Sequence, residues 1–410
     1  MPAFHITAAS TAASLPYVTA GAAALALLLV AKSVMVPGPS PPSARAKHVL
    51  LSPRTTLLPK LSSDEAAALP YPPDVLPGAR DVETPYGSLR VYEWGPIEGD
   101  KVLLVHGIST PCVALAPLAE ELVKRGRRVM LFDLFGRGYS DAPADLPYDA
   151  RLYTTQILLA LASSPLPWTG GARNAFTIAG YSLGGGIAAD FTSHFPHLIA
   201  SLVLIAPGGL IRPAHISWKS KLLYNTPLPS PLIHRLVGRR LYTPPTTAPP
   251  PSTPRPASAT DAAQAEAGPP VRTRRSNSTL SHPALLVPPR PAITAAAAVN
   301  WQLAAHPGFV PAFVSSIRHA PVYAQHVRWR VVGERLAQER AAAEAKGEVA
   351  RKKVLLVLGQ ADPIVIADEV RVDAEGVLGG EANLETVVLE AGHEVPMSRA
   401  REVAEAMVGF

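Results

Sequence analysis

The chain has 410 residues, of which 48% are hydrophobic and 17% charged, so it is long and apolar enough for a core domain with additions. No basic face interleaved with aromatic residues accompanies the net charge of +6, and nucleic-acid binding therefore has no support. Cys112 is the only cysteine, which excludes an intrachain disulfide and mildly favours a reducing compartment.

An apolar run covers residues 17–36, after a short N-terminal tail at residues 1–16. Only Lys32 interrupts the run, and its length approaches the roughly 20 residues that cross a bilayer. We therefore predict a transmembrane anchor in contact with membrane lipid, with a cleaved signal peptide or a buried core helix as alternatives. Because the segment before the run has no Lys or Arg, a signal peptide is disfavoured. The basic residues that follow predict a single-pass protein whose body faces the cytosol, at an endomembrane such as the endoplasmic reticulum, whereas a signal peptide would predict secretion.

Residues 37–78 are rich in proline and predict a stalk, with one helical turn at 64–69. After the stalk, apolar runs of strand length alternate with helix-like stretches. The predicted strands are an edge hairpin strand at Leu89–Trp94, then Lys101–Val105, Arg128–Phe132, Ala175–Ala179, Leu202–Ile205, Lys353–Leu358 and Leu384–Leu389. The predicted helices are Ala114–Lys124, Arg151–Ala162, Gly185–Phe195 and Ala400–Val408. Since the strand runs are continuous and not alternating, they indicate a mostly parallel α/β sheet covered by helices on both faces.

A long interruption, residues 211–330, separates the two parts of this core at 79–210 and 331–410. Its flanks, 211–242 and 293–330, are rich in apolar and aromatic residues and predict a helical cap. Between them, residues 243–292 are dominated by Pro, Ala, Ser and Thr and predict a disordered insert, because they offer too little apolar surface to offset the ordering entropy. A regulatory role for this insert is an alternative. Residues 333–353, rich in Ala, Glu, Arg and Lys, predict one exposed helix.

The strongest chemical signal is a G-x-S-x-G pattern centred on Ser182, between a predicted strand and a predicted helix. So sharp a turn strains the backbone of the serine and holds its hydroxyl clear of the sheet, while small flanking residues let the neighbouring elements approach. The helix that follows points its free N–H groups and positive dipole end at the reacting oxygen. The pattern thus predicts Ser182 as a nucleophile.

A serine hydroxyl needs a base, and the base needs an orienting acid. His393 follows the last predicted strand in a short loop, and Asp362 follows the preceding strand. Taken alone, Asp362 before a proline could equally be a helix cap. Its place in the chain order Ser, Asp, His, with each residue at a strand end, favours the catalytic interpretation. We therefore predict a triad of Ser182, Asp362 and His393.

Two further loops complete the predicted site. Residues 105–108 end an early strand, and the backbone N–H of Ile108 can serve an oxyanion hole with that of Leu183 as the second donor. In this interpretation His106 itself has no catalytic role. The glycine-rich loop 133–141 follows the next strand and lies near the site, where its role can be wholly structural.

Together, H-G after a strand, D-x-x-G-x-G-x-S, G-Y-S-L-G-G, G-x-x-D and G-H resemble the α/β-hydrolase superfamily, in its lidded single-domain branch, over residues 80–210 and 350–410. The resemblance implies an eight-stranded, mostly parallel sheet with a helical cap inserted after the sixth strand. It also implies kinship with membrane-anchored monoacylglycerol lipases and esterases. The insert 243–292 departs from the pattern and leaves the shape of the lid open.

These residues predict a serine hydrolase that cleaves an apolar or lipid-like carboxylic ester, with no metal and no organic cofactor. One alternative keeps the triad but changes the bond to an amide, thioester, lactone or carbon–carbon bond. Another is a catalytically silent receptor or scaffold. The expected partners are the small-molecule substrate and membrane lipid; protein partners cannot be inferred from the sequence.

Overall fold

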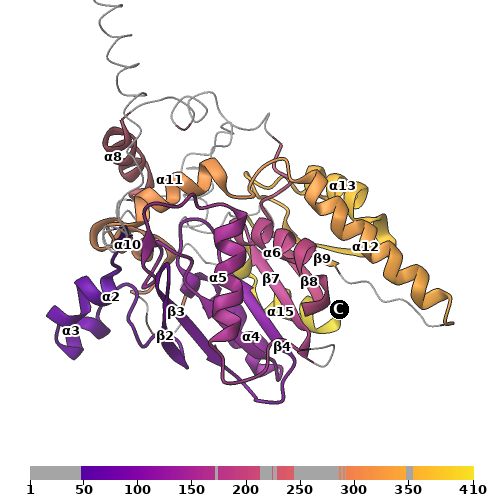
Figure 1. The fold of residues 1–410 in the computed structure, drawn as a ribbon, viewed down its shortest axis with the longest axis horizontal. Coiled ribbons are helices and arrows are strands. Elements are labelled where there is room, and N and C mark those ends of the chain that lie inside the picture. The colour runs from indigo at the N-terminus through magenta and orange to yellow at the C-terminus, as the bar shows by residue number, and fades with distance from the viewer. Residues whose placement is uncertain are drawn as a thin grey trace, which may run out of the picture. The chain divides into compact units, whose positions relative to one another are not determined.

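The computed structural model describes residues 48–170, 174–212, 224, 229–243, 286–287, 290, 292–347 and 354–410. All of these except His48 belong to one compact unit, Val49–Phe410. A sheet of eight strands lies at its centre, with helices packed around it (Figure 1). The predicted fold class, a mostly parallel eight-stranded sheet with a helical cap after its sixth strand, is confirmed.

The strands lie across the sheet in the order β10-β9-β8-β7-β4-β5-β3-β2. Their bounds are β2 (Ala79–Thr84), β3 (Gly87–Trp94), β4 (Lys101–Val105), β5 (Arg128–Phe132), β7 (Phe176–Tyr181), β8 (Ile199–Ile205), β9 (Val354–Gly359) and β10 (Leu384–Leu389). Every pair from β10 to β5 is parallel, whereas β3 runs antiparallel to both β2 and β5. The carboxyl ends of the parallel strands therefore meet at one edge, where the loops that follow them lie together.

The predicted edge strand Leu89–Trp94 is not at the edge. It forms most of β3, which is buried, and the edge position belongs to β2. The side chains of β2 alternate between exposed and half-buried, so its sequence contains no continuous apolar run to reveal it.

The helices separate by their contacts into two groups. In one group, α4 (Ala116–Lys124) packs against α15 (Ala400–Gly409). In the other, α6 (Leu183–His194) packs against α5 (Ala150–Ala162) and α12 (His326–Glu344), and α12 packs against α13 (Ala367–Leu378). The short helices are η3 (Cys112–Leu115), η5 (Pro196–Leu198), η7 (Gly380–Ala382) and α14 (Val395–Ser398).

Helix α12 contains most of the exposed helix predicted at 333–353 but starts before it. It begins earlier, at His326, and Trp329 and Val332 on it are buried. Together with Leu336 these residues recur at helical spacing, so one stripe of α12 is apolar and packs against α6 and α13. The predicted helix is therefore present and exposed from residue 334 on, and the prediction missed its buried first turns, which precede residue 333.

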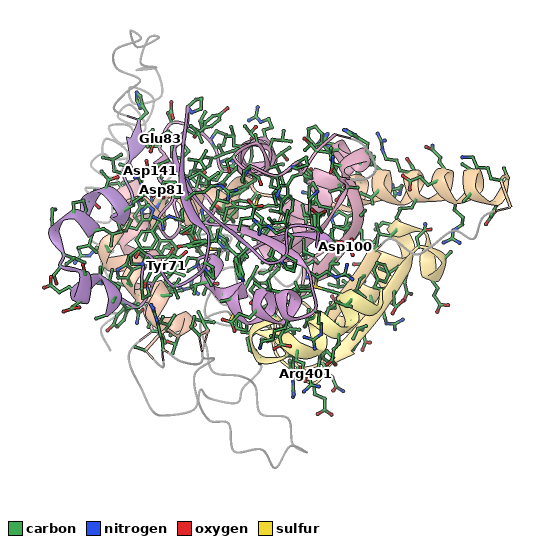
Figure 2. The ribbon with its side chains drawn as sticks, turned by 90° about the horizontal axis from the view of Figure 1, so that it is seen from below. Tyr71, Asp81, Glu83, Asp100, Asp141 and Arg401 are labelled. Carbon is green, nitrogen blue, oxygen red and sulfur yellow. The ribbon has the colours of Figure 1, made fainter. Side chains whose placement is uncertain are left out.

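Residues 49–78 do not form the stalk predicted at 37–78; they pack on the core. Strand β1 (Val49–Leu50) pairs antiparallel with β6 (Ala142–Pro143), and the helices α2 (Pro53–Thr56), η2 (Leu58–Lys60) and α3 (Ser63–Ala67) follow. Tyr71 is fully buried (Figure 2), and its hydroxyl donates to the carboxylate of Asp133 at 3.0 Å. The prolines break up the periodicity by which these contacts could have been predicted.

The cap between β8 and β9 contains α8 (Ser230–Leu241), α10 (Ala295–Ala305) and α11 (Phe309–His319). Most of the predicted insert 243–292 lies outside the described residues. At its C-terminal end, however, Leu286 and Val287 are buried against the core, so this end of the segment packs as part of the cap.

The predicted anchor, residues 17–36, also lies outside the described residues. Within the part of the chain that the structure describes, no helix combines the length and the apolarity needed to cross a membrane. This finding contradicts the predicted single-pass membrane location, since a helical span needs about 20 consecutive apolar residues.

Candidate active site

The turn that joins β7 to α6 holds Ser182 in a strained backbone conformation, with φ 52° and ψ −120°. Two glycines make the turn this tight. A Cβ at Gly180 would overlap the carbonyl of Gly184, and a Cβ at Gly184 would overlap the carbonyl of Val105. The carbonyl of Ser182 accepts from the N–H of Gly208 at 2.7 Å, so contacts outside the turn hold the strained conformation in place.

His393 lies between Ser182 and Asp362. Its Nδ1 is 2.7 Å from Oδ2 of Asp362, and its Nε2 is 3.0 Å from Oγ of Ser182. Because a carboxylate only accepts, Nδ1 carries the proton and Nε2 is left as the acceptor for the serine hydroxyl. The exposed fractions of Ser182, Asp362 and His393 are 6%, 5% and 1%, so bulk water barely weakens these bonds.

Asp362 is itself held by the loop after β9. Its Oδ1 accepts the backbone N–H groups of Ile364 at 2.8 Å and Val365 at 2.9 Å. One carboxylate oxygen is thus committed to the loop and the other to His393. The ring of Tyr181 packs against the imidazole, with centroids 5.4 Å apart.

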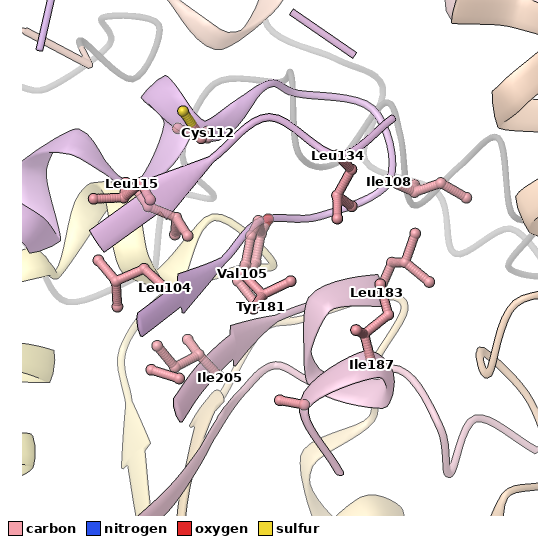
Figure 3. Packing of buried hydrophobic residues seen from close by; sticks show 14 of the residues in the cluster. Leu104, Val105, Ile108, Cys112, Leu115, Leu134, Tyr181, Leu183, Ile187 and Ile205 are labelled. Carbon is pink, nitrogen blue, oxygen red and sulfur yellow. The ribbon is translucent and has the colours of Figure 1, made fainter. Parts of the chain in front are cut away.

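The two predicted oxyanion donors come from neighbouring elements. Leu183 is the first residue of α6, where the N–H has no partner within the helix. A Cβ at Gly184 would also lie 2.7 Å from the carbonyl oxygen of His106, so the start of α6 abuts the loop that bears Ile108. Figure 3 shows Ile108 and Leu183 within the buried cluster at this end of the sheet.

His106 has a structural place in this loop. Its Nε2 accepts the N–H of Leu134 at 2.9 Å, so its Nδ1 bears the proton and donates to the carbonyl of Gly107 at 2.8 Å. Burial, assisted by the positive charge of Arg137, lowers the pKa of His106 to about 3. The side chain is therefore neutral at physiological pH and fixes the loop.

The structure thus brings together all five residues singled out from the sequence: Ser182, Asp362 and His393 by direct hydrogen bonds, and Ile108 and Leu183 by the approach of their segments. An arrangement of this kind can move a proton from a serine hydroxyl to an imidazole and stabilise the imidazolium that results. Among the described residues no cluster of His, Cys, Asp and Glu could hold a metal ion.

A family model for the alpha/beta hydrolase fold matches residues 101–227 of the chain. An uncharacterized protein of Mycobacterium tuberculosis is 29% identical over 183 residues, which are 42% of this chain and 50% of that one. A serine hydrolase-like protein of Danio rerio is 29% identical over 128 residues, 31% of this chain and 37% of the relative. Carboxylesterase CesB of Bacillus subtilis superimposes with a TM-score of 0.51 at 15% identity, over 85% of this chain and 95% of that one.

The chain has the α/β-hydrolase fold, and the part of it that carries the serine turn matches that family's model. It spans about half the length of the mycobacterial relatives that it matches, and the likeness to the esterase structure concerns the fold alone.

One ionisable neighbour of the triad was not predicted from the sequence. Glu394 is buried, and its carboxylate accepts the N–H of Gly392 at 3.1 Å. Burial raises the pKa of Glu394. Its position directly after His393 was the signal available in the sequence, although its burial could not be foreseen from a loop rich in polar residues.

Proposed function

We propose that the protein is a serine hydrolase that cleaves carboxylic esters through an acyl-enzyme on Ser182. The observation that carries the proposal is a pair of hydrogen bonds. One joins Oγ of Ser182 to Nε2 of His393 at 3.0 Å, and the other joins Nδ1 of His393 to Oδ2 of Asp362 at 2.7 Å. A serine hydroxyl reacts under neutral conditions only when a base of this kind takes its proton.

In the proposed reaction, Oγ of Ser182 attacks the acyl carbon while its proton passes to Nε2 of His393. Asp362, hydrogen-bonded to Nδ1, stabilises the imidazolium. The carbonyl oxygen becomes an oxyanion, stabilised by the N–H groups of Ile108 and Leu183. His393 then protonates the departing alkoxide, and a water activated by the same imidazole releases the acid and restores the serine hydroxyl.

Apolar side chains surround the triad along the chain, which supports an uncharged, apolar acyl group. The buried apolar residues within three positions of its members include Tyr181, Leu183, Ile364, Val365 and Val395, and the buried carboxyl of Glu394 would repel a negative acyl group. A charged acyl chain would lose its hydration in such surroundings, and an unpaired charge is costly to bury.

Two separate measurements on the full chain test the proposal: covalent labelling with a fluorophosphonate probe and, on unlabelled protein, the hydrolysis of p-nitrophenyl esters. We expect the probe to label the wild type but not Ser182→Ala, and turnover to be faster for neutral acyl chains than for a charged chain of matched length. Monoacylglycerols in the same panel would reveal a preference for lipid esters. A wild type that neither takes the label nor hydrolyses any ester would refute the proposal and favour a silent scaffold.

A further inference from the structure

The loop that bears the proposed oxyanion donor Ile108, here called the oxyanion loop (residues 106–110), accepts side-chain hydrogen bonds at three successive carbonyls. His106 donates to the carbonyl of Gly107 at 2.8 Å, Arg137 donates through Nε to that of Ile108 at 3.1 Å, and Gln302 donates to that of Ser109 at 2.9 Å. In a planar trans peptide the C=O and the N–H point in opposite directions. The orientations of these carbonyls therefore fix those of the N–H groups that follow them.

Arg137 is the charged one of these three donors. It lies in the glycine-rich loop 133–141 after β5, here called the arginine loop. Its side chain is fully buried, and its remaining bonds run to the carbonyl of Phe135 and the hydroxyls of Tyr153 and Ser316. No carboxylate forms an ion pair with it in the part of the chain that the structure describes. Burying a cation among neutral partners is expensive, and such a cost is tolerated where the charge serves a site.

Two of these contacts come from the cap. Ser316 on α11 accepts from Nη2 of Arg137 at 2.9 Å. Gln302 on α10 is fully buried; it accepts the N–H of Gly138 at 2.8 Å and donates to the Ser109 carbonyl. Because an N–H only donates and a carbonyl only accepts, the amide of Gln302 has one orientation. Cap helices thus hold both the arginine loop and the oxyanion loop.

We propose that Arg137 is a positioning residue for the oxyanion hole, held in place by cap helices α10 and α11. It holds Ile108 from its carbonyl side, while His106 holds the Gly107 carbonyl, whose peptide carries the Ile108 N–H. Arg137 thus limits the rotation of the Ile108 segment after the donor N–H. Its positive charge, which forms no ion pair among the described residues, favours the negative charge that develops on the substrate oxygen. The inference rests on the proposed function, and it makes this part of the cap a fixed component of the active site.

The test compares the full-length wild type with Arg137→Met, which keeps an unbranched stem and loses the charge and all donors, and with Arg137→Lys. Two ligands separate the roles: a trifluoromethyl ketone, which adds to Ser182 and places an oxyanion in the hole, and the matching methyl ketone, which binds without adding. We expect Arg137→Met to weaken the trifluoromethyl ketone and to lower kcat by roughly 10- to 100-fold. KM and the methyl ketone should change less than about threefold, and Arg137→Lys should recover part of the loss.

Arg128→Met is the matched control. Arg128 is also largely buried, but it starts β5 at the far end from the arginine loop and pairs with Glu93. The Arg128→Met variant should have a lower melting temperature than the wild type but the same ratio of the two ketone affinities. If Arg137→Met does not fold, Gln302→Leu decides, with an expected ratio loss of about three- to tenfold.

If the wild type forms its Ser182 adduct but the variants keep the wild-type ratio of trifluoromethyl ketone affinity to methyl ketone affinity, the inference is refuted and the proposed function stands. A wild type that forms no Ser182-dependent adduct refutes the proposed function and this inference with it.

Discussion

Replacing Asp362 by Asn should abolish most activity while leaving the fold intact. In the wild type, Oδ1 of Asp362 accepts two loop N–H groups and Oδ2 accepts the proton of His393 Nδ1. In the variant the side-chain oxygen must stay on the two loop donors, because an NH₂ group there would face N–H groups. The NH₂ group then points at Nδ1 of His393, which must become an acceptor. The proton moves to Nε2, and the imidazole can no longer take the proton of Ser182.

A wrong tautomer of this kind costs about 10⁴ in kcat, which corresponds to about 5.5 kcal/mol of transition-state stabilisation. Stability should fall by only about 1 kcal/mol, because both loop hydrogen bonds survive in neutral form. The assay is kcat/KM on a neutral p-nitrophenyl ester, with the melting temperature measured in parallel. Asp368→Asn, on the exposed surface of α13 with 95% of its side chain accessible, should leave both values unchanged. Activity of Asp362→Asn within tenfold of the wild type would refute the tautomer argument and the assignment of the acid.

Three further predictions test the site and its supports. Ser182→Ala should prevent covalent labelling and reduce turnover by roughly 10⁴- to 10⁶-fold; label that persists on another serine would contradict the assignment. Gly184→Ala should cost about 1–3 kcal/mol, since its Cβ overlaps a backbone carbonyl, whereas Gly376→Ala on α13, with open space around it, should stabilise by about 0.5–1 kcal/mol; equal thermal shifts would refute the packing argument. The third prediction concerns acid sensitivity. Burial lowers the pKa of His106 to about 3 and that of His306 to about 4. Because the usual pKa of histidine is about 6.5, the unfolded chain binds more protons than the folded chain below that pH. Stability should therefore fall from about pH 6.5 towards 4, and a chemical denaturation series in which His306→Gln is as acid-sensitive as the wild type would exclude a contribution from that residue.

The strands of the large sheet other than β2, and the proposed nucleophile, could be predicted because each is encoded locally. Continuous apolar runs indicate strands that are covered on both faces, and the glycines around Ser182 indicate a turn whose tightness follows from backbone sterics alone. Asp362 and His393 could be singled out because the carboxyl ends of parallel strands share one edge of the sheet. Their catalytic roles stay predictions, although the structure places both side chains within hydrogen-bond distance of their partners.

Only the tertiary structure decided the contacts that join segments far apart in the chain. Gln302 reaches Gly138 across 164 positions, and Tyr71 reaches Asp133 across 62. Neither pair leaves a periodic pattern, since a single polar side chain in a cap helix or a proline-rich segment looks like any solvent-exposed residue. Such side chains become buried only when two independently formed elements pack together and each supplies the hydrogen-bond partner that the other lacks. The packing of residues 49–78 and the hydrogen bonds from the cap to the oxyanion loop therefore depend on the tertiary structure and could not be predicted from the sequence.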